Sequence, residues 1–403
     1  MSLNKKSTYS DVIINSQNIY ELGLAIYLVV SLIQFSTFMD YFSDNSMHYL
    51  LYIGLGLILF KMFFLDKQDL KEFAVKILTL GFLVLIWRTS SDFMLLTMGV
   101  YILGAKDVQF RRIIKLYFIV GTMTLLFIMV CSLTGVIKNL IYHRIFNSVT
   151  RQSFGIIYPT DFAAHVLYLL LAYSYLKFEQ LSWGSYACYL VIAWLLITFC
   201  DARLSAITIV IAIPVLWLGQ KALRGNKVAR GLTYFYWWIP AILAYLTICS
   251  YYFYTQSNSL FEKMNYFLSG RLFLGKLAID KYGFSWFGTH VIEHGWGGSK
   301  GFKMTTSNPD NYFYIDSSFL RVAILYGIIA LIIIVTIMTI ITWRSVHVYR
   351  YALASIITLV AISAIVEQRL VDLSFNPFLL ALLANIYPKD VRLGRIRNEK
   401  LHN

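Results

Sequence analysis

Arginine and aspartate side chains at the ends of apolar segments are the groups in this chain best suited to chemistry. Arg203 lies between two apolar stretches separated by almost no loop, Arg271 follows a glycine, and Asp316 directly precedes another apolar stretch. A guanidinium group presents a fork of N–H donors that binds phosphate or pyrophosphate through two hydrogen bonds. A carboxylate held beside it can act as a general base toward a hydroxyl group. Where these residues meet, we expect a site for a phosphate-bearing substrate.

Arg271 and Asp316 both belong to the one long polar segment of an otherwise very apolar sequence, residues 255–316. Within it, apolar and charged residues alternate over Arg271–Tyr282 as in a helix that lies on a membrane surface. The stretch from 232 to 254 before the segment carries no charge, and the stretch from 317 to 342 after it carries only Arg321. We therefore predict a large loop with amphipathic helices between the ninth and tenth membrane spans.

The composition is that of a protein embedded in a membrane. The chain has 403 residues, of which 58% are hydrophobic and 14% charged, whereas a soluble domain has about 25% charged residues. We predict an all-α, polytopic membrane protein in which residues 1–403 form a single membrane domain. A membrane span needs about 20 apolar residues, and about twelve stretches approach that length: residues 19–39, 48–65, 73–88, 90–104, 113–137, 156–176, 185–200, 204–219, 232–254, 317–342, 352–367 and 370–387.

The positions of lysine and arginine predict the orientation of these spans. Basic residues recur in alternate connecting segments, for example at Lys67 and Lys71, within 106–115, within 221–230, and in the tail from Lys389. Because short basic segments face the cytoplasm, both termini are expected inside and the 255–316 loop outside a bacterial cytoplasmic membrane. These segments also explain the net charge of +14, so membrane lipid is an expected partner and nucleic acid is not.

Further charged residues lie on the outer side in this orientation. Arg151 and Arg321 are expected to contact substrate phosphate, and bracing of Asp316 is a second possible role for Arg321. Candidates for a sugar-binding groove are Asp161, His165, Glu367 and Arg369.

Each of these residues also has a structural alternative, which the sequence leaves open. In chain order, the alternatives are a loop role for Arg151, a hydrogen-bonded pair of Asp161 and His165, pairing of Arg203 with Asp201 at a helix end, a solvated charge at Arg271, a cap at Asp316 for the helix that follows, and a local group of ion pairs among Glu367, Arg369 and Asp372.

No metal and no cofactor are expected. The run from His290 to His294 matches the H-x-x-E-H pattern of one class of zinc protease. Glycine-rich neighbours on both sides are typical of a loop, however, and not of the stable helix that this zinc chemistry needs. The four cysteines show neither ligand nor disulfide spacing.

Four segments resemble the Wzy-type polysaccharide polymerases and the O-antigen ligases. The run DARLSAITIVIAIPVLWL is similar to their arginine-led helix start, and SGRLFLGKLAIDKYGFSWFG resembles their second arginine segment. YIDSSFLRVAILYGIIAL resembles the return helix, and EQRLVDLSFNPFLLAL is similar to the closing Asn-Pro segment of capsule and exopolysaccharide polymerases. Each motif is short, and the resemblance rests on their order around one large outer loop, over about residues 150–385.

The resemblance implies a metal-independent, inverting glycosyltransferase with a GT-C-like membrane fold. Donor and acceptor would both be oligosaccharides linked to a polyprenyl pyrophosphate, with a flippase and a chain-length regulator as possible partners. The family's paired arginines would correspond to Arg203 and Arg271, and Asp316 would take the position that is often histidine in the ligases. The loop after Arg271 lacks the proline expected of the family.

Two other functions remain open at the level of sequence. A ligase of the same fold would pass the glycan to a different acceptor, although the Asp-Ser and Asn-Pro features favour a polymerase. A non-enzymatic flippase or transporter of lipid-linked sugars would carry charged residues in the middle of its spans. Here the middle of most spans is almost free of charge and the charges lie near the outer ends, which favours chemistry at the surface.

Overall fold

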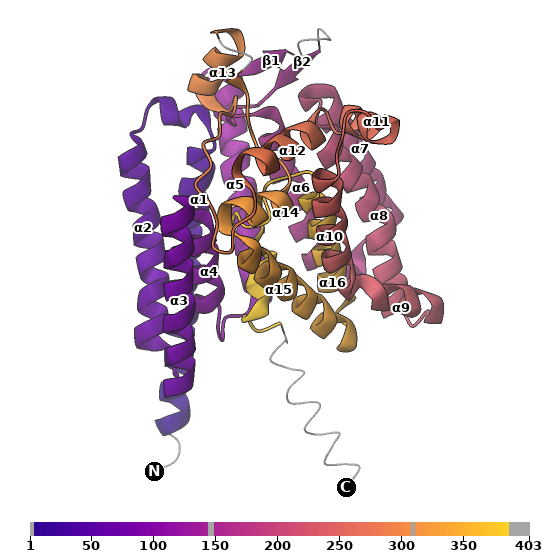
Figure 1. The fold of residues 1–403 in the computed structure, drawn as a ribbon. Coiled ribbons are helices and arrows are strands. Elements are labelled where there is room, and N and C mark those ends of the chain that lie inside the picture. The colour runs from indigo at the N-terminus through magenta and orange to yellow at the C-terminus, as the bar shows by residue number, and fades with distance from the viewer. Residues whose placement is uncertain (1–3, 144–148, 308–310, 387–403) are drawn as a thin grey trace.

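A computed structural model describes residues 4–143, 149–307 and 311–386, and nearly all of its regular structure is helical (Figure 1). The α-helices are α1 (Asn4–Gln34), α2 (Asp44–Phe60), α3 (Leu70–Ser90), α4 (Met94–Gly104), α5 (Phe110–Leu133), α6 (Pro159–Leu176), α7 (Trp183–Cys200), α8 (Arg203–Leu223), α9 (Lys227–Tyr234), α10 (Ile239–Tyr252), α11 (Ser259–Phe267), α12 (Arg271–Tyr282), α13 (Gly298–Ser307), α14 (Ser318–Arg321), α15 (Ile328–His347) and α16 (Tyr351–Ala364). Two short antiparallel strands, β1 (Ile141–His143) and β2 (Thr150–Gln152), were not expected from the sequence.

Six helices of the described residues are long and apolar enough to cross a membrane. They lie within α1, α2 with the π-helical turn that follows it, α5, α7, α8 and α15. A bent pair made by α9 and α10 would bring the number to seven, and α4 and α16 are shorter apolar helices. The structure is therefore compatible with an all-α, multi-pass membrane protein, but it does not show the twelve spans predicted from the sequence.

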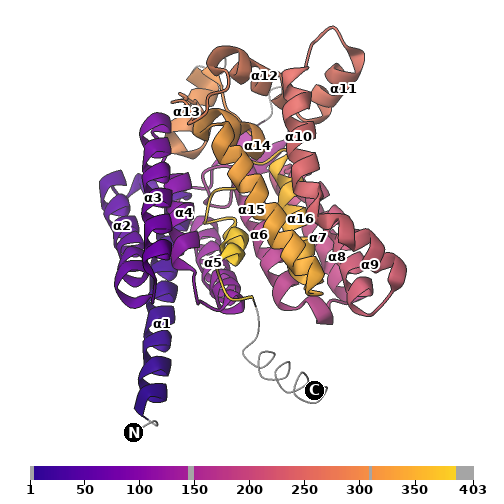
Figure 2. The same cartoon turned by 60° about the horizontal axis from the view of Figure 1, so that its bottom comes forward.

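The helices form two groups that meet where α5 packs against α6, and α15 packs against α10 and α16 (Figures 1 and 2). One group contains α1 to α5, and the other contains α6 to α10. At one end of the molecule lie α11, α12, α13 and the β1–β2 hairpin, and at the opposite end lie α9 and the start of α1 (Figure 1). The helix predicted over Arg271–Tyr282 is confirmed, because α12 has these bounds and turns Leu272, Ala278 and Ile279 inward. The basic tail from Lys389 lies outside the described residues.

The last predicted span, 370–387, is wrong, because its described part is a buried, mostly irregular segment. In this described part, the regular structure is a short 3-10 helix, η7 (Pro377–Leu382), which begins at Pro377 with Asn376 as its N-cap residue. A proline disfavours the helical conformation of the residue before it, so a longer helix does not run through this point. Backbone groups that a helix would pair internally find other partners: the Tyr117 hydroxyl donates to the Phe375 carbonyl at 2.8 Å, and the Asn376 side chain donates to the Leu370 carbonyl at 2.7 Å. Irregular backbone at membrane depth is tolerated where protein surrounds it in this way.

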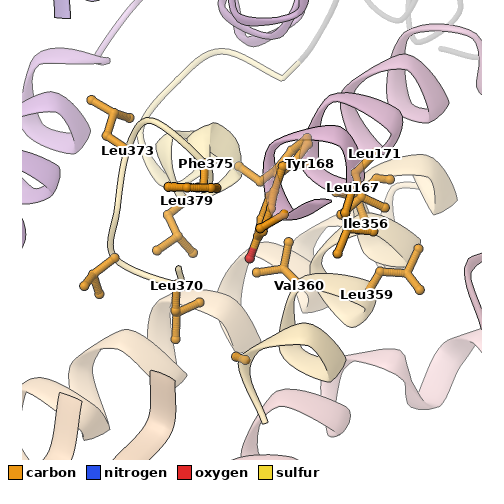
Figure 3. Close-up of a cluster of buried hydrophobic side chains, with 14 of the residues drawn as sticks. Leu167, Tyr168, Leu171, Ile356, Leu359, Val360, Leu370, Leu373, Phe375 and Leu379 are labelled. Carbon is orange, nitrogen blue, oxygen red and sulfur yellow. The ribbon is translucent and has the colours of Figure 1, made fainter. Parts of the chain in front are cut away.

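Apolar packing holds the same segment in place (Figure 3). Its side chains Leu370, Leu373, Phe375 and Leu379 are almost completely buried. Figure 3 shows them beside the labelled side chains of α6 and of α16. This packing fixes the chain beyond α16 against α6. Glu367 and Arg369 lie in the short stretch between the end of α16 and Leu370.

The predicted span 317–342 is interrupted near its N-terminal end. After α14, a π-helical turn (Val322–Tyr326) leads to Gly327, where φ is 92°, and α15 begins at the next residue. The loop that follows α12 packs into this break: the Ile328 N–H donates to the Ser285 carbonyl at 3.0 Å, and the Thr289 N–H donates to the Leu325 carbonyl at 3.1 Å. A Cβ atom on Gly327 would lie 2.4 Å from the Trp286 carbonyl oxygen. Only glycine allows this close approach of loop and helix.

We therefore expect Gly327→Ala to destabilise the protein by about 1–3 kcal/mol or more, since the substitution adds a clash to a backbone conformation that L-residues avoid. The measurement is the melting temperature of the purified protein in detergent. Gly56→Ala is the matched control, because Gly56 lies in α2 with nothing within 4 Å of an added Cβ. Equal melting temperatures for the two variants would contradict this account of the break.

Candidate functional site

The structure brings Arg271 and Asp316 into direct contact. The Arg271 Nε lies 3.1 Å from Oδ2 of Asp316, and the two side chains are only 12% and 19% exposed. Arg271 is the first residue of α12, which begins directly after Gly270 in a left-handed conformation. Asp316 is not the helix cap, because Ser317 holds that position in front of α14. The polar segment 255–316 thus holds a guanidinium against a carboxylate where it joins α14.

Other groups complete the surroundings of this pair. Burial by itself would lower the pKa of Arg271, but Asp316 and Glu367 raise it above its ordinary value, so the guanidinium stays charged. The Ser205 hydroxyl of α8 donates to Oε1 of Glu367 at 3.2 Å. Burial and the nearby Asp316 raise the pKa of Tyr312, so its hydroxyl remains a proton donor. Three segments distant in sequence therefore meet at Arg271.

One donor of Arg271 is left unused by this arrangement. Its Nη1 is buried and has no hydrogen-bond partner among the described residues. A buried donor without a partner costs about 1–3 kcal/mol. Such a donor beside a carboxylate is suited to bind an acceptor atom of a ligand, such as a phosphate oxygen.

Arg369 forms a second buried ion pair close by. It binds Asp161 of α6 directly, lies 3.9 Å from Asp372, and packs 4.4 Å from the centre of the Phe375 ring. His165 stacks on the same Phe375 ring, with the two ring centres 3.8 Å apart. Asp161 is bound by Arg369 and not by His165. Of the alternatives that the sequence left open, the structure therefore shows ion pairs of Arg369 with Asp372 and also with Asp161, whereas Glu367, the third residue of the expected group, accepts a hydrogen bond from Ser205.

Glu367 connects the two ion pairs. It lies within electrostatic reach of Arg271 and of Arg369. The carboxylates of Asp161 and Asp316 also interact electrostatically with the Glu367 carboxyl group. The expected groove residues Asp161, Glu367 and Arg369 thus adjoin the Arg271–Asp316 pair in one buried group of charges.

Arg321 forms a third buried ion pair, which supports the segment next to Asp316. Its Nη1 donates to both carboxylate oxygens of Glu293 at 2.5 and 2.6 Å, and its Nη2 lies 3.6 Å from Asp92. Oε1 of Glu293 also accepts the backbone N–H of Ile315 at 2.9 Å. Arg321 therefore supports Asp316 indirectly. It binds Glu293, and Glu293 accepts the backbone N–H of Ile315, the residue before Asp316. Glu293 is the glutamate of the H-x-x-E-H run, so this residue serves an ion pair in the structure.

Arg151 and Arg203 form hydrogen bonds with groups other than Asp316. Arg203 donates from Nε to Asp201 at 2.9 Å and is 53% exposed, so its ion pair is formed with Asp201 and not with Asp316. Asp201 adopts a left-handed conformation in the tight turn between α7 and α8, which sets its carboxylate beside Arg203. Arg151 is buried in β2, where Nε donates to the Cys200 carbonyl at 3.1 Å. Among the described residues, Asp316 therefore forms its ion pair with Arg271, and Arg203 forms its ion pair with Asp201.

The described residues contain no group of three or more His, Cys, Asp or Glu side chains that could hold a metal ion. Comparison with protein-family models, with curated proteins and with solved structures gives no match. The chemistry of the site is therefore argued from its own contacts.

The burial of Arg369 predicts a strong effect on stability. Arg369→Met would leave Asp161 buried without its counter-ion, and breaking such a pair costs about 3–5 kcal/mol. Arg112 pairs with Glu21 at 2.8 Å but is 49% exposed, and loss of an exposed pair costs about 1 kcal/mol or less. Thermal unfolding in detergent compares Arg369→Met with the control Arg112→Met. A similar, small change for both would show that Arg369 is not held in a buried pair.

Proposed function

We propose that this chain is a membrane glycosyltransferase that joins oligosaccharide repeat units carried on a polyprenyl pyrophosphate. The observation that carries the proposal is the buried pair of Arg271 and Asp316, in which the guanidinium keeps one unused donor. A phosphate-binding cation next to a carboxylate is the minimum that transfer from a sugar pyrophosphate to a hydroxyl group requires. The order of the segments around this pair, which resembles that of Wzy-type polymerases, supports the same assignment.

In the proposed reaction, a hydroxyl oxygen of the acceptor sugar attacks the anomeric carbon of the donor sugar. The bond from that carbon to the pyrophosphate oxygen breaks, and the configuration at the carbon is inverted. The hydroxyl proton passes to Asp316, where we assign it to Oδ1 because Arg271 contacts Oδ2. The electron pair of the broken bond stays on the pyrophosphate, whose growing charge is stabilised by the Arg271 Nη1 donor.

The other charged residues take supporting roles in this proposal. Arg203 is a further candidate for a phosphate contact at the exposed rim, because Asp201 engages its Nε and the guanidinium is 53% exposed. Arg369, with Asp161 and Asp372, positions Glu367 behind Arg271. Arg321 positions Asp316 through Glu293.

The proposed location is the outer face of a bacterial cytoplasmic membrane, with both termini in the cytoplasm. Two observations support it. The Arg271–Asp316 pair belongs to the end of the molecule that carries α11, α12 and α13, and the start of α1 lies at the opposite end (Figure 1). The short basic segments of the sequence also favour a cytoplasmic position for that opposite end.

Arg271→Lys and Asp316→Asn test the proposed chemistry. Lysine keeps the charge that Asp316 and Glu367 need but loses the forked donor, and asparagine keeps the shape of aspartate but cannot take the proton. We expect either change to slow chain elongation by about 100- to 1000-fold. The assay incubates purified protein in nanodiscs with a lipid-linked repeat unit and follows the ladder of products on a gel.

Lys276→Gln is the control for this experiment, because Lys276 lies on the same helix and pairs with the exposed Asp280 at 3.0 Å. Melting temperatures show whether each variant is folded. Wild-type elongation by folded Arg271→Lys or Asp316→Asn protein would refute the assigned roles.

The glycolipids of a strain that lacks the chain separate polymerase from ligase. We expect single repeat units to accumulate on the lipid carrier, because no enzyme would join them. Full-length polymer that stays attached to the carrier would instead identify a ligase.

A further inference from the structure

A basic hollow lies at the end of the molecule opposite to the Arg271–Asp316 pair. It has a volume of about 220 Å³ and is formed where α5 begins, α6 and α8 end, and α16 begins. A second hollow of about 390 Å³ adjoins it, since both are lined by Glu179 and Leu223. Neither hollow contains a residue of the proposed catalytic group.

Basic side chains from different elements line the first hollow. They are Arg111 from α5, Lys177 after α6 and Arg350 before α16, and Arg224 lines the adjoining hollow. Arg111 donates to the Leu176 carbonyl at 3.0 Å, which fixes its guanidinium at the end of α6. In the described part of the chain, none of Arg111, Lys177 and Arg350 forms an ion pair with a carboxylate. The one carboxylate that lines the hollow is Glu179, so positive charge dominates there.

The start of α16 adds to this positive field. Arg350 is the N-cap residue of α16, and its side chain makes no capping hydrogen bond. Tyr351, Ala352 and Leu353, the first residues of the helix, line the hollow. Backbone N–H groups in the first turn of a helix carry partial positive charge and bind anions. The cationic side chains and the helix start therefore face the same space.

The remaining lining is apolar and suits a lipid. Leu176, Phe178, Leu353 and Ile386 contribute carbon surface to the hollow. Basic pockets between helices at a membrane surface bind the phosphate-bearing headgroups of anionic lipids. Guanidinium groups prefer phosphate because its oxygens accept paired hydrogen bonds.

We infer that this hollow binds a phosphate group, carried by an anionic phospholipid headgroup or present as free phosphate. The site is separate from the proposed catalytic group: Asp161 lies near the start of α6 and Leu176 at its end, and 15 residues of helix rise about 22 Å. The inference therefore does not rest on the proposed glycosyl transfer, and either can fail without the other.

The test compares wild-type protein with Arg111→Gln/Arg350→Gln. Each protein is placed in nanodiscs that contain phosphatidylglycerol and phosphatidylcholine, and native mass spectrometry of the released protein reports which lipid stays bound. We expect wild-type protein to retain phosphatidylglycerol in preference to phosphatidylcholine. The double variant should bind it at least about tenfold more weakly, which corresponds to about 1.4 kcal/mol, because it loses two guanidinium groups that donate charge-assisted hydrogen bonds to phosphate.

Lys71→Gln/Lys227→Gln is the matched control, because it removes the same charge from exposed positions outside the hollow. Inorganic phosphate is then added as a competitor. Displacement of the lipid identifies a site for which free phosphate is sufficient, and retention of the lipid identifies a headgroup site. Equal lipid binding by wild type and Arg111→Gln/Arg350→Gln would overturn the inference. If the folded control variant lost as much phosphatidylglycerol binding as Arg111→Gln/Arg350→Gln, the inference would also be overturned, because surface charge alone would then explain the binding.

Discussion

Burial of arginine against carboxylates from distant parts of the chain is the interaction on which the end of the molecule near α12 and α14 depends. Arg271 binds Asp316, Arg321 binds Glu293, and Arg369 binds Asp161. A charge removed from water must be paired, because the cost of leaving it alone is several kcal/mol. Each pair therefore fixes the relative position of two segments that are distant in the sequence.

These pairs explain why the chain departs from simple membrane-spanning helices at this end. Arg369 and Glu367 stand in the irregular segment beyond α16, and Arg321 stands in the short helix before the break at Gly327. In a continuous helix, only residues three or four positions apart point in the same direction. The breaks allow charged side chains from neighbouring positions in the sequence to point into one buried group. The freed backbone groups are paired by the loop after α12 and by Tyr117 and Asn376.

The sequence predicted the helical, membrane-like character of the chain and the bounds of α12 because these depend on local patterns of apolar and charged residues. It also indicated Arg271, Asp316, Glu367 and Arg369, because charges next to apolar spans need partners. The meeting of Arg271 with Asp316 was expected, but the pairs of Arg369 with Asp161 and of Arg321 with Glu293 were not predicted. Asp161 pairs with a residue 208 positions away, and Glu293 pairs with Arg321 from within a loop that resembled a metal motif. The failed prediction for 370–387 has the same origin, since a fully buried irregular segment is as apolar as a span.

Among the buried arginines, Arg271 differs in a way that bears on function. Arg321 is bound by both oxygens of Glu293. Arg369 also keeps one buried donor, Nε, without a partner among the described residues, but it lies beyond α16, between the Phe375 ring and the carboxylates of Asp161 and Asp372. Arg271 meets a single oxygen of Asp316 through Nε and keeps Nη1 without a partner. Its position at the start of α12, in the polar segment 255–316, leaves it at the boundary between the buried charges and that segment. A guanidinium that is fixed at one nitrogen and unpaired at another is oriented before a ligand arrives. This is the arrangement in which an electrostatic group stabilises a transition state without reorganising.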